Sequence, residues 1–172
     1  GICVVVHPSR EVSGLSKEQL KGIFTGRIQT WSEVDAGQGE IDVISRDASS
    51  GTFGVFKKLA LDGESIEGAD ASEVKGNSEM KARVAKNANA IGYLGMAYVD
   101  ETVRVVALNG VEPTETTVGG GEYPLARALY LITNGRPPAG SLTQAFVSFC
   151  QTREGAQMVK TTGYIPLPRL KF

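Results

Sequence analysis

The sequence contains few of the residues that build metal centres and disulfide frameworks. Among its 172 residues are two cysteines and one histidine, so the usual zinc ligand sets cannot be assembled. Cys3 and Cys150 both lie in apolar segments. They either form a disulfide that closes the chain ends or remain two buried free thiols, and we favour the free thiols because so few cysteines define no framework. The sequence predicts no metal site and no cofactor.

Long apolar runs and an excess of charge of one sign are also missing. No apolar run approaches the ~18 residues that a membrane-spanning helix needs, and no basic segment followed by an apolar one marks an export signal. The 18 basic and 19 acidic residues give a formal net charge of −1, which does not indicate binding to nucleic acid or to a membrane surface. We expect an ordinary globular protein whose export signal, if it has one, lies outside this sequence.

What the sequence does contain is an alternation of short apolar runs and amphipathic segments. The apolar runs predict strands over residues 2–6, 41–44, 91–95, 103–108 and 129–132. Helical spacing, with Ser16 and Gln19 as a capping box for the first helix, predicts helices over residues 16–24, 53–60, 77–88, 142–150 and 153–161. Residues 62–72 and 111–121 are interpreted as loops, and Trp31 as a buried apolar plug. The alternation predicts an α/β fold with a largely parallel sheet.

One stretch, IDVISRDASSGTFGVFKKLAL at residues 41–61, carries a distinctive chemistry. A strand passes through a hydroxyl-rich turn into a helix, whose first turn has unpaired N–H groups and a partial positive charge. A guanidinium, three hydroxyls and a glycine that permits close approach complete a set of anion donors. The candidate anion-binding residues are Arg46, Ser49, Ser50, Gly51 and Thr52. The same residue types are also common helix N-caps, and the stretch lacks the spacing and the lysine of a P-loop.

Four stretches together resemble the periplasmic phosphate-binding proteins of the high-affinity phosphate ABC importer, the PstS-type family. They are LSKEQLKGIFTG at residues 15–26 with Trp31, then VISR with SGT within residues 43–52, then NAIGYLG at residues 89–95, and lastly YPLAR at residues 123–127 with GAQMVKTTGYIPL at residues 155–167. The resemblance covers nearly the whole chain. It places the family's Arg-x-x-x-Ser-Gly-Thr motif on Arg46, Ser50, Gly51 and Thr52, the residues that hold phosphate in such proteins.

The resemblance implies a fold, a location and partners. It implies a type II periplasmic-binding-protein-like fold, with a mostly parallel sheet flanked by helices. One main lobe with the oxyanion-binding turn would occupy residues 1–125, and residues 126–172 would form a C-terminal segment returning toward an incomplete first lobe. The implied function is the binding of inorganic phosphate, or a similar oxyanion, for the permease of an ABC importer in the periplasm or another extracytoplasmic space.

The sequence departs from the family pattern in two places. The N-terminal portion that supplies the opposing phosphate donors is missing, so we expect weak oxyanion binding by this chain alone. Many relatives also carry an acidic residue two positions after the arginine, where this sequence has Ala48, with Asp47 one position earlier. Asp47 either replaces that acid in part or faces solvent.

Two other functions compete with the transport receptor. A hydrolase triad would need Ser50 and His7, but the sequence has no G-x-S-x-G elbow, and we do not expect an enzyme. Alternatively, the chain is a short single-lobed or domain-swapped oxyanion sensor or interaction module. A surface left by the missing N-terminal portion would then favour a homodimer or a partner that supplies the missing strands.

Overall fold

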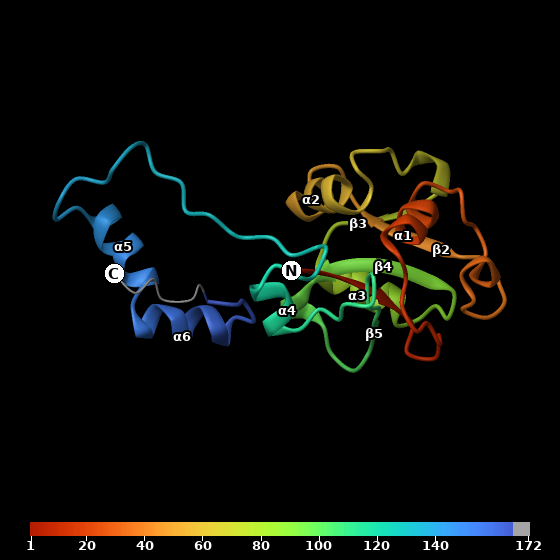
Figure 1. Cartoon of the computed structure of the whole chain (residues 1–172). Coiled ribbons are helices and arrows are strands. Elements are labelled where there is room, and N and C mark those ends of the chain that lie inside the picture. Colours follow the sequence, from red (N-terminus) through yellow and green to blue (C-terminus); the bar gives the residue numbers. More distant parts are fainter. Residues whose placement is uncertain (167–172) are drawn as a thin grey trace. The chain divides into compact units, whose positions relative to one another are not determined.

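Two compact units make up the chain, Gly1–Arg127 and Ala128–Phe172, and the computed structural model describes residues 1–166 (Figure 1). Leu167, the last residue of the fourth sequence stretch, lies outside the described residues. The predicted division after residue 125, with the roles that it assigns to the two parts, stays a prediction.

A mixed five-stranded sheet forms the centre of the first unit. Its strands are β1 (Ile2–Val6), β2 (Asp42–Arg46), β3 (Ser72–Val74), β4 (Ala90–Gly95) and β5 (Arg104–Val105), in the order β3-β2-β4-β1-β5. Strand β2 runs parallel to both of its neighbours, β3 and β4, whereas β1 runs antiparallel to β4 and β5. The carboxyl ends of β2, β3 and β4 therefore meet at one edge of the sheet, and the start of β1 lies at that same edge.

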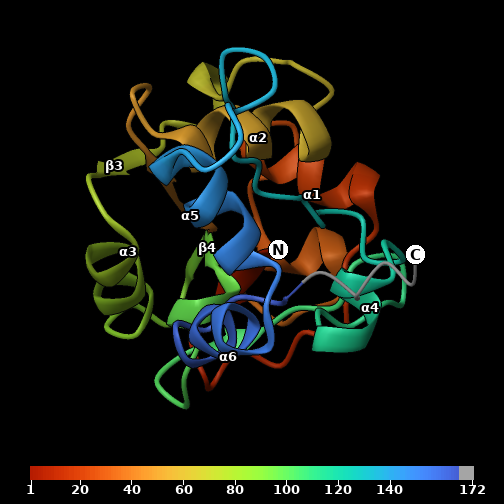
Figure 2. The ribbon, with the colours of Figure 1, turned by 90° about the vertical axis from the view of Figure 1, so that its left-hand side faces the viewer.

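Helices cover both faces of this sheet, which confirms the predicted α/β class. Helices α1 (Lys17–Phe24) and α2 (Gly51–Ala60) lie on one face, and α3 (Asn77–Val84) lies on the other (Figures 1 and 2). The alternation of side chains along β4 explains both layers. Leu94 belongs to the buried cluster that includes α3, while Tyr93 stacks on Phe56 of α2 with ring centroids 3.8 Å apart.

The start of α1 and the burial of Trp31 agree with the sequence predictions. Ser16 and Gln19 form the predicted capping box, in which the Ser16 hydroxyl accepts from the amide of Gln19. Trp31 begins the 3₁₀ helix η1 (Trp31–Val34) and is fully buried. Its indole N–H donates to the carbonyl of Asn89 at 3.1 Å, so the polar end of this large side chain is satisfied.

The two predicted loops contain short elements that the sequence did not predict. Residues 62–72 include the 3₁₀ helix η2 (Glu67–Ala69) and reach the start of β3, which is too short and too polar to show a strand pattern but pairs with β2. Residues 111–121 include α4 (Glu115–Gly119), which Thr114 caps through the amide of Thr117. The predicted strand over residues 103–108 is reduced to β5, while η3 (Met96–Tyr98) follows β4.

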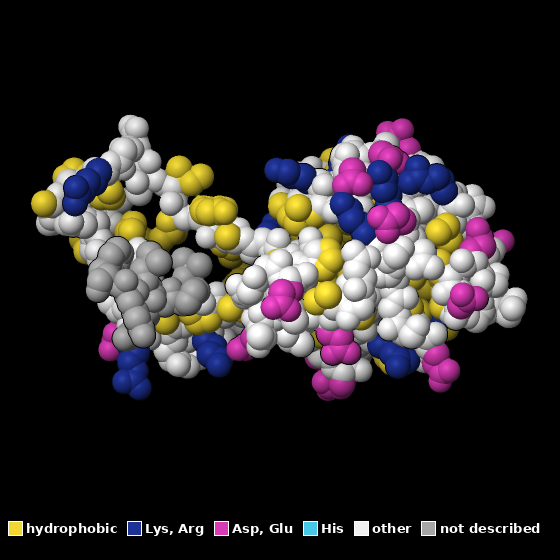
Figure 3. All heavy atoms as spheres, in the orientation of Figure 1, with side chains coloured by type: hydrophobic (Ala, Val, Ile, Leu, Met, Phe, Trp, Pro, Cys, Tyr) yellow, Lys and Arg dark blue, Asp and Glu magenta, His cyan; other side chains and the backbone are white. Residues whose placement is uncertain are grey.

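The second unit contains two helices that contact each other, α5 (Leu142–Cys150) and α6 (Arg153–Thr161), as the sequence predicts. The predicted strand over residues 129–132 is wrong. These four apolar side chains are 57–92% exposed, because no described strand pairs with them and an isolated strand is not stable in water. Further apolar side chains on α5 and α6 are exposed as well, and hydrophobic side chains are visible over this unit in Figure 3.

Two remaining expectations concern the cysteines and the membrane. Both cysteines are free, as expected, but only Cys3 in β1 is buried; Cys150 at the end of α5 is half-buried, so the expectation of two buried thiols is wrong for Cys150. Burial raises the pKa of the Cys3 thiol to about 11, which makes it a poor nucleophile at neutral pH. None of the helices that the structure describes has the length and apolar character needed to cross a bilayer.

Candidate functional site

The turn between β2 and α2 has the conformation of a capped helix start. Ser50 is the N-cap residue of α2, and its hydroxyl oxygen accepts from the amide of Phe53 at 3.3 Å. The amide of Ser50 donates to the carbonyl of Asp47 at 3.0 Å, which closes the turn. The helix starts at Gly51, two residues before its predicted start. The described part of the chain offers no acceptor for the hydroxyl proton of Ser50, so this proton can be donated to a ligand.

The carboxylate of Asp47 is held within the turn. One of its oxygens accepts from the amide of Ser49 at 3.0 Å and also from the Ser49 hydroxyl. The hydrogen bond from this hydroxyl lowers the pKa of Asp47, and the charge of Arg46 adds a smaller lowering. Asp47 is therefore ionised at neutral pH, and the hydroxyl of Ser49 is engaged with it.

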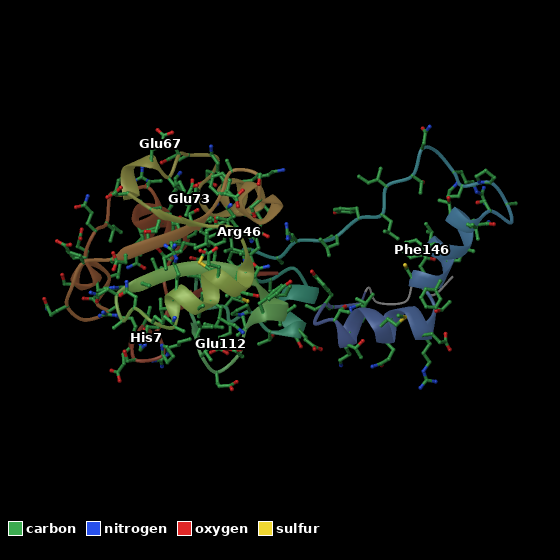
Figure 4. All side chains as sticks on the ribbon, turned by 180° about the vertical axis from the view of Figure 1, so that it is seen from behind. His7, Arg46, Glu67, Glu73, Glu112 and Phe146 are labelled. Carbon is green, nitrogen blue, oxygen red and sulfur yellow. The ribbon has the colours of Figure 1, made fainter. Side chains whose placement is uncertain are left out.

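The side chain of Arg46 is anchored at the edge of the sheet where the parallel strands end (Figure 4). Its Nη2 donates to the carbonyl of Lys75 at 2.8 Å, and its Nη1 lies 3.5 Å from the amide oxygen of Asn77. The same oxygen accepts from the amide of Gly95 at 3.3 Å. The Nε–H of Arg46 is buried and has no hydrogen-bond partner among the described residues. An orphaned buried donor is costly, so this group is suited to meet an acceptor from outside the chain.

A buried hydroxyl pair holds the backbone of Arg46. The phenol oxygen of Tyr93 lies 2.9 Å from the hydroxyl of the fully buried Ser45 and accepts from the amide of Arg46 at 3.1 Å. The Ser45 hydroxyl also lies within hydrogen-bond distance of the carbonyl of Arg46, at 3.3 Å. Burial raises the pKa of Tyr93, so the phenol stays protonated at neutral pH.

The first turn of α2 is open and carries a positive potential. A side-chain carbon placed on Gly51 would meet nothing within 4 Å, so a ligand can approach the backbone there. Thr52 follows in the same turn and is half-buried. The first turn of α2 contains no acidic residue, whereas α1, α3 and α6 each have one. The carbonyl of Gly51 accepts from Nη1 of Arg127 at 3.3 Å.

The structure brings the five predicted site residues together in one turn and keeps His7 away from them. The imidazole of His7 is bonded to Ser9 at 2.8 Å, just after β1 and thus at the opposite edge of the sheet from Arg46 (Figure 4). No His7–Ser50 pair forms. Among the described residues, no group of three or more His, Cys, Asp or Glu is arranged to hold a metal ion.

Three residues that shape the turn were not predicted as site residues. Tyr93 and Arg127 belong to the NAIGYLG and YPLAR stretches, so the resemblance was the only sequence signal that could have found them. The sequence predicts Asn77 only as the first residue of the helix over residues 77–88. All three come from segments distant in the sequence, so no local spacing reveals their contacts with Arg46 and Gly51.

Comparison with known proteins identifies what the chain is similar to. The family model of the PBP superfamily domain matches residues 1–154. The phosphate-binding protein PstS of Bacillus subtilis (strain 168) is 34% identical over 173 residues, which cover 99% of this chain and 56% of that protein. The chain thus spans about half the length of the curated relatives that it matches.

Solved structures agree in fold. An ABC-type phosphate transport receptor from Vibrio cholerae matches with a TM-score of 0.83 and 31% identity, covering 98% of this chain and 69% of that one. A putative phosphate ABC transporter substrate-binding protein from Clostridium perfringens, solved with bound phosphate, matches with a TM-score of 0.82 and 30% identity, covering the same shares.

Proposed function

Because the chain belongs to the PBP superfamily, and within it to the family of phosphate receptors, we propose that it binds inorganic phosphate for an ABC importer. The observation that carries this proposal is the buried, unpartnered Nε–H of Arg46 beside the open start of α2. A guanidinium and helix N–H groups at the carboxyl ends of parallel strands form the kind of site at which α/β proteins bind oxyanions.

The proposed ligand-binding residues are Arg46, Ser50, Gly51, Thr52 and Ser49. Arg46 supplies the charge, the hydroxyls of Ser50 and Thr52 donate hydrogen bonds, and the N–H groups at Gly51 and Thr52 face the anion. Ser49 differs from the others, because its hydroxyl must leave the carboxylate of Asp47 before it can donate to the ligand.

The finer parts of the function rest on the relatives' names. The relatives are named as binding proteins and transport receptors, which supports a role without catalysis, at an extracytoplasmic location and beside an importer permease.

A further proposal concerns the exposed apolar side chains of the second unit. They are residues 129–132 and, on α5, Leu142 and Phe146. By itself, the chain of residues 1–172 forms homodimers that cover this surface, and size-exclusion chromatography with light scattering tests this.

Isothermal titration with phosphate tests the binding site. Each charge-assisted hydrogen bond contributes roughly 1.5–3 kcal/mol, so Arg46→Ala is expected to abolish measurable binding while circular dichroism stays unchanged. We expect the unmodified chain to bind weakly, with sulfate as a competitor. Arg136→Ala, which removes an exposed arginine of the second unit, is the matched control and should bind as the unmodified chain does. Unchanged binding by Arg46→Ala would place the site elsewhere.

A further inference from the structure

Arg127 reaches the anion-binding turn from a distant part of the sequence. It is the last residue of the first unit, and its Nη1 donates to the carbonyl of Gly51 at 3.3 Å. This places a second guanidinium beside the first turn of α2. The side chain is half-buried and forms no ion pair with any carboxylate of the described residues.

This position is electrostatically unfavourable without a ligand. The N-terminal end of a helix carries a partial positive charge, so a cation beside it is repelled. No acidic residue in the first turn of α2 offsets this repulsion, and the one carboxylate of the turn, that of Asp47, is bonded to Ser49. An anion bound at the turn would relieve the repulsion from both guanidiniums and from the helix end.

A comparison with Arg10 distinguishes a binding role from a purely structural one. The guanidinium of Arg10 donates to the carbonyls of Ala36, Gln38 and Ala88 and to the side chain of Asn89, and it lies 5.0 Å from the centre of the Trp31 ring. Its donors are used up in holding loops together. Arg127 makes one long hydrogen bond, which leaves its other N–H groups for an acceptor from outside.

We propose that Arg127 is a second anion-binding side chain of this site and that its positive charge, rather than its hydrogen bond to Gly51, is what the site requires. The inference rests on the proposed function, since it assigns a further residue to the same phosphate site. It also implies that the site is built for an anion of more than one negative charge, because two guanidiniums and a helix end face a single carboxylate.

Two substitutions separate charge from hydrogen bonding. Arg127→Gln keeps a neutral donor for the carbonyl of Gly51, and Arg127→Lys keeps the charge. Phosphate titrations at low and at high salt should show roughly tenfold weaker binding for Arg127→Gln at low salt, the effect of one charge-assisted hydrogen bond. Arg127→Lys should retain most of the affinity. The phosphate affinity of Arg127→Gln should fall less steeply with rising salt than that of the unmodified chain. Arg136→Gln is the matched control.

Each outcome decides between the two roles. If Arg127→Gln binds phosphate as tightly as the unmodified chain, the charge is not required and the inference is overturned, while the proposed function stands as long as Arg46→Ala abolishes binding. If the unmodified chain binds no phosphate, both are overturned. Urea unfolding of each variant identifies any loss of folded protein. Arg127→Lys and Arg127→Gln alter the same contact with Gly51, so equal losses of phosphate affinity in both variants would also contradict a role for the charge.

Discussion

The phenol oxygen of Tyr93 accepts a hydrogen bond from the backbone amide of Arg46 at 3.1 Å, although Tyr93 lies on β4 and Arg46 ends β2. The two strands are parallel neighbours, and the bond forms where β2 leaves the sheet. The Tyr93 ring contacts Phe24 and Phe56, which also contact each other, so the hydrophobic core of α1 and α2 sets the position of the hydroxyl. The core thereby fixes where the anion-binding turn begins.

Removal of this hydroxyl should weaken both folding and binding. Tyr93→Phe keeps the ring stacking but leaves the Arg46 amide without its acceptor and the buried Ser45 hydroxyl with only the carbonyl of Arg46, a loss of about 1–3 kcal/mol in the free energy of unfolding. Phosphate affinity should fall as well, because the backbone of Arg46 loses its restraint. Urea unfolding and calorimetry measure the two effects. Tyr98→Phe, which alters a tyrosine that is 41% exposed, should change neither, and equal stability of both variants would contradict the role of Tyr93.

The carboxylate of Asp47 should oppose anion binding. Asp47→Asn keeps an acceptor for Ser49 but removes a negative charge from the turn. At about 4 Å in water such a charge repels an anion by about 1 kcal/mol, so phosphate should bind roughly fivefold more tightly at low salt.

The effect of Asp47→Asn should shrink at high salt, because screening weakens the repulsion between exposed charges. Titration of Asp35→Asn provides the control, since Asp35 is an exposed acid that follows η1. Weaker phosphate binding by Asp47→Asn would show that the carboxylate supports the site instead of opposing it.

Gly26 and Gly63 both have positive φ angles, of 77° and 86°, but only Gly26 is crowded. A side-chain carbon at Gly26 would lie 1.9 Å from the carbonyl oxygen of Gly68, whereas one at Gly63 would meet nothing within 4 Å. Gly63→Ala should therefore cost only the roughly 1–2 kcal/mol of the left-handed backbone. Gly26→Ala should cost clearly more, because η2 must move away from the end of α1. Chemical denaturation compares the two, and equal losses would refute the close backbone contact.

Stability should fall at acidic pH through Asp100. Hydrogen bonds from Lys81 and Thr102 lower the pKa of Asp100 to about 2, below the value of about 3.9 for an unfolded aspartate. The stabilisation is therefore complete above about pH 4 and is lost as the pH falls through about 2. The melting temperature of Asp100→Asn should be lower than that of the unmodified chain at neutral pH, and the difference should narrow between these pH values. A constant difference would contradict the assignment.

Local sequence signals were sufficient where the residues that define an element are neighbours in the sequence. Ser16 with Gln19 marks a helix start through contacts within four residues. The continuous apolar run of β1 is typical of a strand buried between two neighbours, here β4 and β5. The turn at Arg46 was predicted for the same reason, since its donors are consecutive in the sequence. Their role as phosphate ligands stays a prediction.

The signals failed where the outcome depends on a partner elsewhere. Residues 129–132 have the apolar character of a strand but no described neighbour to pair with, and β3 has a polar sequence but becomes a strand because β2 lies beside it. The contacts of Asn77 and Arg127 with the site depend on strand order and on a chain segment that returns to α2. A single sequence does not reveal such arrangements, because spacing within a segment carries no information on what the fold brings next to it.

The amide of Ile2 donates to the carbonyl of Leu125 at 3.1 Å, so the two ends of the first unit lie side by side. Both ends are at the sheet edge that carries Arg46, because Ile2 pairs with Gly95 at the end of β4. The two ends of the first unit can therefore be joined by a short linker, and the unit reopened at an exposed loop. A circular permutant of this kind would keep the turn between β2 and α2 intact.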